Sequence, residues 1–314
     1  MADAPEADAP ELVAVGGAMV DRYYTLSNLP EPDGGAYVRD SREGVGGVAA
    51  NVASAAAALG REAGIVTRLG DDERAEIVER DLRERDIDTS RVRRGTEEST
   101  YSLVFRADGE RMVVTGGGSC AALDLRAADE PYLRDAGVVA ATAYVPERAA
   151  APLVGMRERG ELAALSFDLS GPLDELEGRG MTPETIDRAV AACDLFLAGE
   201  VALAAYLEYH DADDPVAFLR DRGVERAALT RGSEGATLLT PDGIVEIPAF
   251  EVDVVDPTGA GDAFHAALAD AWLLDGRPAE EAGEFAAAVA ALNCTGDGAR
   301  GGLPSREAAE ALRD

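Results

Sequence analysis

Short apolar runs alternate along much of the chain with segments whose apolar residues recur at helical spacing. Four such runs lie between residues 137 and 232 and alternate with helical segments: GVVAATAYV, LAALSFDLS, CDLFLAG and RAALTRG. Apolar strands that alternate with helices are typical of a parallel sheet covered on both faces. We therefore predict a three-layer α/β/α fold with a mainly parallel central sheet, and we expect ligands at the ends of its strands.

The two ends of the chain extend the same alternation. Near the N-terminus the pattern predicts a strand at 11–17, a helix at 51–60, a strand at 62–70 and an amphipathic helix at 73–86. At the C-terminus, two alanine-rich helices are expected on either side of the segment NCTGDGARGGLP. These elements add strands and covering helices to the same sheet.

Two hairpins interrupt the alternation. In the segment 101–118, two β-rich runs flank an Ala-Asp-Gly-Glu turn, and the segment 236–250 has a similar form. The segment around 20–45 also lacks the strand–helix rhythm. We predict that about 18–45 and 99–118 form a small β accessory over the main sheet.

The length of 314 residues allows either two domains or one large α/β unit. Because no linker or repeat divides the chain, we predict one domain over residues 11–314. The acidic, Pro/Ala-rich segment MADAPEADAP at 1–10 is expected to be a disordered tail, since it lacks the basic start and apolar run of a signal peptide. No stretch is apolar enough to predict a membrane span.

The charge balance is strongly acidic, with a net charge of −31, and all 29 basic residues are arginine. Such a chain is not expected to bind nucleic acid or an anionic membrane. Acidic excess together with loss of lysine resembles the proteins of extreme halophiles, whose surfaces are screened by concentrated salt.

We therefore predict that the protein needs high salt to stay folded. Its melting temperature should rise steeply between low and molar KCl, because salt screens the repulsion among surface carboxylates. Thermal melts across a KCl series check this. A melting temperature that does not change with KCl would contradict it.

The absence of lysine also excludes several mechanisms. A P-loop, a protein kinase and a Schiff-base enzyme each require one. With only His210 and His265, a Ser-His-Asp triad or a histidine metal site is not expected, and we assign His265 no role beyond packing. Three dispersed cysteines predict buried thiols in a reducing cytoplasm, not zinc or disulfides: Cys120, Cys193 and Cys294.

The stretch DVVDPTGAGDAFHAAL at 253–268 carries the clearest chemistry. The valines Val252, Val254 and Val255 predict a strand, and a helix should begin near Asp262. Small residues at a helix start leave its N–H groups open, which makes an anion site. An aspartate at this site would repel the anion. Its presence is explained if the aspartate accepts a proton from the group that attacks the anion. A capped helix after a glycine turn is the alternative.

This stretch resembles the second signature of the PfkB (ribokinase-like) carbohydrate kinases, Asp-x-x-Gly-Ala-Gly-Asp-x-Phe. The matching positions are Asp256, Gly259, Ala260, Gly261, Asp262 and Phe264. The resemblance implies a ribokinase-like fold with a β-sheet lid, in which Asp262 is the catalytic base and Gly259, Ala260 and Gly261 form an anion hole for the transferring phosphate. A K⁺ site near Asp256 is a further possibility.

The segment 46–70 is similar to the first signature of the same family. It implies a sugar site built from Gly46, Gly47 and Asn51, whose amide both donates and accepts hydrogen bonds. The resemblance also places Asp21 where the family grips sugar hydroxyls, although a turn aspartate is an alternative.

Two further segments resemble the nucleotide site of the family, so that the likeness covers roughly residues 11–312. TRGSEGATL implies that Thr230, Gly232 and Gly235 line ATP, with a simple tight turn as the alternative. ALNCTGDGARGGLP places Asn293 beside the adenine.

One departure concerns the metal. The family usually carries Asn-x-x-Glu where this chain has Gly199 and Ala202. Glu200 and Asp168 are then the candidates to orient water ligands of Mg²⁺, which itself is held mostly by nucleotide phosphates.

The sequence thus predicts ATP-dependent phosphorylation of a hydroxymethyl group of a small sugar, of the ribokinase, fructokinase or keto-deoxy-sugar kinase type. A nucleoside or sugar-phosphate kinase of the same family is the alternative, and the lid arginines do not decide between them: Arg22, Arg39, Arg42, Arg106 and Arg111. A catalytically silent sugar- or nucleotide-binding protein is a second alternative. A nicotinamide dehydrogenase is disfavoured by the bulky Phe264 and the late position of the motif. The family likeness suggests a homodimer through the lid.

Overall fold

The computed structural model describes residues 10–176 and 178–313, so that most of the acidic segment 1–10 lies outside the described residues. Its main feature is a nine-stranded sheet in the order β13-β12-β11-β10-β9-β8-β1-β4-β5. The strands are β1 (Leu12–Val15), β4 (Ala63–Leu69), β5 (Val92–Arg94), β8 (Val138–Thr142), β9 (Leu165–Asp168), β10 (Leu195–Gly199), β11 (Ala227–Thr230), β12 (Ala236–Thr240) and β13 (Gly243–Ile247). All pair in parallel except β12 and β13, which form the predicted antiparallel hairpin at one edge.

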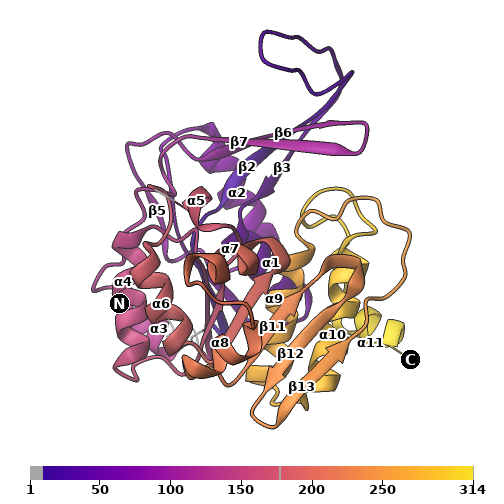
Figure 1. The fold of residues 1–314 in the computed structure, drawn as a ribbon. Coiled ribbons are helices and arrows are strands. Elements are labelled where there is room, and N and C mark those ends of the chain that lie inside the picture. Colours follow the sequence, from indigo (N-terminus) through magenta and orange to yellow (C-terminus); the bar gives the residue numbers. More distant parts are fainter. Residues whose placement is uncertain (1–9, 177, 314) are drawn as a thin grey trace.

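Helices cover both faces of this sheet, which confirms the predicted three layers (Figure 1). In β1, Leu12 and Ala14 point into one buried core, whereas Val13 and Val15 point into the other. The first core packs against α1 (Val48–Ala58), α2 (Glu73–Glu84), α9 (Ala260–Leu268), α10 (Ala279–Asn293) and α11 (Arg306–Arg313). The second packs against α3 (Glu130–Asp135), α4 (Glu147–Glu158), α5 (Leu173–Leu176), α6 (Pro183–Ala192), α7 (Glu200–Tyr209) and α8 (Pro215–Asp221).

A separate four-stranded sheet, here called the lid sheet, stands at one end of the molecule (Figure 1). It consists of β2 (Met19–Leu26), β3 (Val38–Gly46), β6 (Tyr101–Ala107) and β7 (Glu110–Gly116), in the order β3-β2-β6-β7. The predicted hairpin at 101–118 supplies β6 and β7, and the segment near 20–45 supplies β2 and β3. In the centre, β2 and β6 pair in parallel.

Two local predictions were wrong. The valines before the glycine motif form no strand: Val254 and Val255 are 60% and 61% exposed. The segment is instead held by N–H groups of Val255 and Asp256, which both donate to the carbonyl of Cys294. The following helix begins at Ala260, near Asp262 as predicted. The three cysteines are free, as predicted, but only partly buried.

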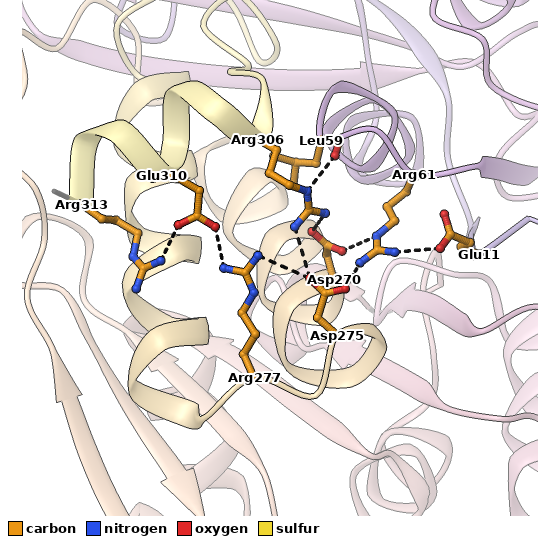
Figure 2. Close-up of polar contacts among 9 residues, drawn as sticks. All are labelled: Glu11, Leu59, Arg61, Asp270, Asp275, Arg277, Arg306, Glu310 and Arg313. Atoms are coloured by element: carbon orange, nitrogen blue, oxygen red, sulfur yellow. Dashed lines mark hydrogen bonds and ion pairs between the residues drawn. The ribbon is translucent and has the colours of Figure 1, made fainter.

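An ion-pair network ties the C-terminal helix to neighbouring helical segments (Figure 2). At its centre lies Asp270, whose side chain is fully buried in a π-helical segment (Ala269–Leu274) that follows α9. One carboxylate oxygen accepts from Arg61 Nε at 2.5 Å and the other from Arg306 Nη2 at 2.5 Å. Asp275 pairs with the same two arginines. The network therefore joins the end of α1, the π-helical segment and α11.

Among the described residues, no helix combines the length and apolarity that a membrane crossing requires.

Candidate active site

A cavity of about 320 Å³ opens where the parallel strands end. Asp168, Gly199 and Thr230 are the last residues of β9, β10 and β11, and all three line it. The opposite wall is the glycine motif, through Gly259, Gly261 and Asp262 among others. This is the edge at which parallel α/β sheets bind ligands.

The loop before α9 adopts a shape that only glycine tolerates at one point. Gly259 has φ +76°, and a Cβ there would lie 2.1 Å from the carbonyl oxygen of Ala299. Next to it, the N–H of Ala260 donates to the carbonyl of Pro257 at 3.3 Å. Gly261, by contrast, borders open space. The positive end of α9 is therefore turned toward the cavity with little side-chain cover, which suits an anion.

Asn293 supports this loop from below. Its side chain is fully buried, and Nδ2 donates to the carbonyls of Ala299 at 3.0 Å and Thr258 at 3.4 Å. These contacts fix the backbone around Gly259. They do not suit the predicted contact with adenine, so we assign Asn293 a supporting position.

Asp262 lies at the start of α9 and accepts a hydrogen bond from Asn51 Nδ2 at 2.7 Å. Burial raises the pKa of Asp262 to about 7; the hydrogen bond from Asn51 opposes this shift, and the negative charges of Asp168 and Asp21 add to it. A carboxyl group with such a pKa is half ionised near neutral pH. It can therefore take up a proton under physiological conditions.

The predicted sugar residues gather beside Asp262. Asp21 is buried on β2 and accepts from Ser102 Oγ and, at 3.3 Å, from Tyr23 Oη. A Cβ on Gly46 would lie 1.9 Å from Asp21 Oδ2, so only glycine leaves room for this carboxylate. Burial raises the pKa of Asp21, opposed by the hydrogen bonds from Ser102 and Tyr23.

Gly47 and Asn51 complete this group at the start of α1. Gly47 is the N-cap with φ +93°. The buried Oδ1 of Asn51 has no hydrogen-bond partner among the described residues, which leaves it free to accept from a ligand hydroxyl.

Asp256 is the most heavily hydrogen-bonded carboxylate of the site. It accepts from the N–H groups of Thr258 at 3.0 Å and Gly298 at 2.9 Å, and from Arg106 and Arg42 of the lid sheet at 2.7 and 3.3 Å. Burial alone would raise the pKa of Asp256, but these hydrogen bonds outweigh it and lower the pKa to about 2. Both oxygens of Asp256 already accept hydrogen bonds. The K⁺ site near Asp256 stays a prediction.

The predicted metal residues separate in the structure. Asp168 lines the cavity, and its carboxylate accepts from the N–H and the hydroxyl of Ser170, each at 2.9 Å. Burial raises the pKa of Asp168 to about 6. Glu200 is an exposed first residue of α7 and is not among the lining residues. Of the two, only Asp168 is placed to act on a ligand in the cavity.

The remaining nucleotide candidates lie in one turn after β11. Thr230 lines the cavity. Gly232 and Gly235 bound the tight turn, and a Cβ on Gly235 would lie 2.1 Å from the carbonyl oxygen of Ile247. Gly235 thus has a packing reason for being glycine. His265 is fully buried against Ser166, as expected of a packing residue.

The sequence places several arginines in the lid but does not indicate what they contact. The structure brings Arg42 and Arg106 to Asp256, and Arg111 Nη1 donates to Thr258 Oγ1 at 3.2 Å. It also adds two residues that hold Asp21, namely Tyr23 and Ser102. Strand alternation could have found Tyr23, because Asp21 and Tyr23 are two residues apart on β2. Ser102 meets Asp21 through the pairing of β2 with β6, which alternation does not indicate.

Comparison with known proteins gives the same picture. The pfkB family carbohydrate kinase model matches residues 9–306. A protein of Halopiger xanaduensis named ATP-dependent ribose-1-phosphate kinase is 34% identical over 309 residues, which cover 96% of this chain and 97% of that protein. A nucleoside kinase of Methanothermobacter thermautotrophicus is 27% identical over 299 residues, covering 94% and 92%.

Solved structures share the fold. The Arabidopsis thaliana ribokinase complexed with ribose and ATP superimposes with a TM-score of 0.82 at 24% identity, covering 97% of this chain and 98% of that one. A putative ribokinase II from E. coli in complex with ATP and Mg²⁺ gives 0.81 at 21% identity, covering 96% and 98%.

Proposed function

The chain belongs to the PfkB family of carbohydrate kinases, and on that premise we propose that it transfers phosphate from ATP to the primary hydroxyl of ribose 1-phosphate. Family membership removes the dehydrogenase alternative, and the intact Asp262 counts against the silent-binder alternative. The observation that carries the proposal is the carboxyl group of Asp262, which has a pKa of about 7 and lies between the buried Asn51 and the open end of α9.

The choice of acceptor departs from the leading expectation of an unphosphorylated sugar. The relative that supports the change is the ribose-1-phosphate kinase of Halopiger xanaduensis, at 34% identity over 96% of this chain. The relation to a haloarchaeal protein also agrees with the acidic, lysine-free composition. The sugar-phosphate alternative of the sequence analysis therefore becomes the preferred one.

In the proposed reaction, Asp21 and Asn51 hold the ribose hydroxyls and direct the hydroxymethyl group toward Asp262. Asp262 takes the proton of that hydroxyl as its oxygen attacks the transferring phosphate. The N–H groups around Gly261 stabilise the charge on this phosphate. The lid sheet excludes water, which would otherwise compete as acceptor.

The nucleotide and Mg²⁺ fit the donor set of the cavity. Thr230, Asp168 and the start of α9 line the cavity. In the proposal, Thr230 and the start of α9 would meet the phosphates, and Asp168 would hold water ligands of the metal. When bound, Mg²⁺ neutralises phosphate charge. The raised pKa of Asp168 agrees with a carboxyl group that gains from a nearby cation.

The activity should depend on pH through Asp262. Since the pKa is raised to about 7, the carboxyl group is protonated and inactive as a base below that value. We expect kcat/KM to fall about tenfold per pH unit below pH 7 and to level off above it. A pH–rate profile in molar KCl measures this. A profile that stays flat down to pH 5.5 would contradict it.

The proposed function is tested by following ADP release in molar KCl with Mg²⁺. The acceptor panel contains ribose 1-phosphate, ribose, fructose, a keto-deoxy sugar acid and a nucleoside. We expect ribose 1-phosphate to give the highest kcat/KM. A higher value for any unphosphorylated acceptor would overturn the assignment of substrate and leave the kinase chemistry in place.

We also propose that the protein forms a homodimer through the outer face of the lid sheet. Leu103 pairs with Val114 and Phe105 with Met112 across β6 and β7, and Met112 and Val114 are each 47% exposed. Burying such side chains favours association. We expect the double variant Met112→Glu, Val114→Glu to halve the mass measured by light scattering, whereas Val254→Glu keeps it. A monomeric wild type would contradict the proposal.

A further inference from the structure

Three arginines of the lid sheet lie on the same face as the sugar-gripping Asp21. On β2, Asp21, Tyr23 and Thr25 alternate with residues of the other face. Strand register places Arg42 directly opposite Tyr23, Arg106 opposite Thr25, and Arg111 opposite Arg106. Directly paired residues share a face of the sheet. The three guanidinium groups therefore come from β3, β6 and β7 to one side of the lid.

Aromatic contacts tie two of these arginines to the sugar site. The guanidinium carbon of Arg42 lies 3.7 Å from the centre of the Tyr23 ring, and that of Arg106 lies 5.1 Å from it. The hydroxyl of the same tyrosine donates to Asp21. Only the side chain of Tyr23 therefore lies between these two arginines and the carboxylate of Asp21.

The third arginine connects this group to the cavity. Arg111 lines the cavity together with Asp262 and donates to Thr258, which Arg106 also contacts at 3.1 Å. Arg111 makes no ion pair within the described residues. Its charge is therefore available to a ligand.

Three guanidinium groups gather here in a chain whose net charge is −31. Two carboxylates form ion pairs with these arginines. Asp256 pairs with both Arg42 and Arg106, and Asp297 pairs with Arg42. Asp256 is buried and holds two of the arginines in place, whereas the arginine side chains remain 28–29% exposed. Asp256 and Asp297 pair with Arg42 and Arg106, so Arg111 is the guanidinium group of this preorganised cluster that is left to meet a further anion.

We propose that Arg42, Arg106 and Arg111 bind the phosphate group that the acceptor sugar already carries. The planar guanidinium group matches the oxygens of a phosphate, and three of them suit a dianion. Contact of Arg42 and Arg106 with Tyr23, whose hydroxyl donates to Asp21, assigns the cluster to the acceptor side, while the open end of α9 takes the phosphate in transit. This inference rests on the proposed function and explains how a sugar phosphate would be chosen over a free sugar.

The lid offers a matched control for this site. Arg22 lies on the opposite face of the same strand β2, where its Nε pairs with Glu43 at 3.0 Å and both side chains are well exposed. Replacing it removes the same charge from the same sheet on the face proposed for the dimer, so that an effect of the dimer face can be told from an effect of the phosphate site.

The test compares kcat/KM for ribose 1-phosphate and for ribose, each with saturating ATP, in the wild type, Arg111→Ala and Arg22→Ala. Arg111 is chosen because it makes no ion pair that the lid needs for folding. We expect the preference for ribose 1-phosphate over ribose to fall roughly 10- to 100-fold in Arg111→Ala, as one charge-assisted contact predicts. Arg22→Ala should keep the wild-type preference.

Equal losses on both acceptors, or a loss confined to the KM for ATP, would overturn the inference, because the anion would then be the donor's phosphate. A wild type that prefers ribose would overturn both this inference and the proposed substrate. A second readout does not need turnover. Without ATP, ribose 1-phosphate should raise the melting temperature of the wild type more than that of Arg111→Ala, and an equal rise would count against the site.

Discussion

Replacing Asp262 with asparagine should lower kcat about 10²- to 10⁴-fold, because a general base of this kind contributes that much. Asparagine keeps the size of the side chain and can still contact Asn51, but it cannot accept the proton of the hydroxymethyl group. The acidic limb of the pH–rate profile should disappear as well. Steady-state kinetics with ribose 1-phosphate and ATP measures both effects.

Asp253 offers a control for this variant. It is an exposed aspartate nine residues earlier on the same segment, so Asp253→Asn removes the same charge away from the cavity. Its kcat should stay close to that of the wild type. A loss below about tenfold in Asp262→Asn would show that another group takes the proton.

Replacing Asp270 with alanine should cost roughly 3–5 kcal/mol of unfolding free energy. Burial raises the pKa of Asp270 and the charges of Arg306 and Arg61 oppose that shift, so the ionised form depends on both arginines. Without the carboxylate, each guanidinium group loses a buried partner (Figure 2). Urea titration in molar KCl measures the cost.

The outer part of the same network supplies the comparison. Glu310 pairs with Arg277 and Arg313, but 36% of its side chain is exposed. Exposed ion pairs contribute about 0–1 kcal/mol, and molar KCl screens them further. Glu310→Gln should therefore be nearly neutral. Similar losses in both variants would mean that burial does not decide the strength of this network.

The layers of the fold could be predicted from the sequence because each inner strand is apolar on both faces. Leu12 and Val13 show why: neighbours along one strand enter different cores. The strand predicted at Val254 and Val255 is wrong because an apolar pair forms a strand only where a partner strand is available. Here the backbone bonds to Cys294 instead.

Asp262 and the glycines of its loop were predictable because they are adjacent in sequence. The anion site and the base both need residues at the start of one helix, so a single short segment carries the whole signal. The arginine cluster was not predictable, since Arg42 and Arg106 meet Asp256 only when the lid folds over the main sheet. The turn of the hairpin held a partial signal, because a tight turn at Asp108 already places Arg106 opposite Arg111. The position of that hairpin relative to Asp21 depends on the parallel pairing of β2 and β6, which no local pattern indicates.

We propose above all that this chain uses ATP to phosphorylate the primary hydroxyl of ribose 1-phosphate. The most direct measurement is ³¹P NMR of a reaction of the wild type with ATP, Mg²⁺ and ribose 1-phosphate in molar KCl. We predict a product with two phosphate monoesters on one ribose, the new one coupled to the methylene protons at C5, formed together with ADP. Consumption of ATP to inorganic phosphate without that product, or no consumption by the folded protein, would contradict the account.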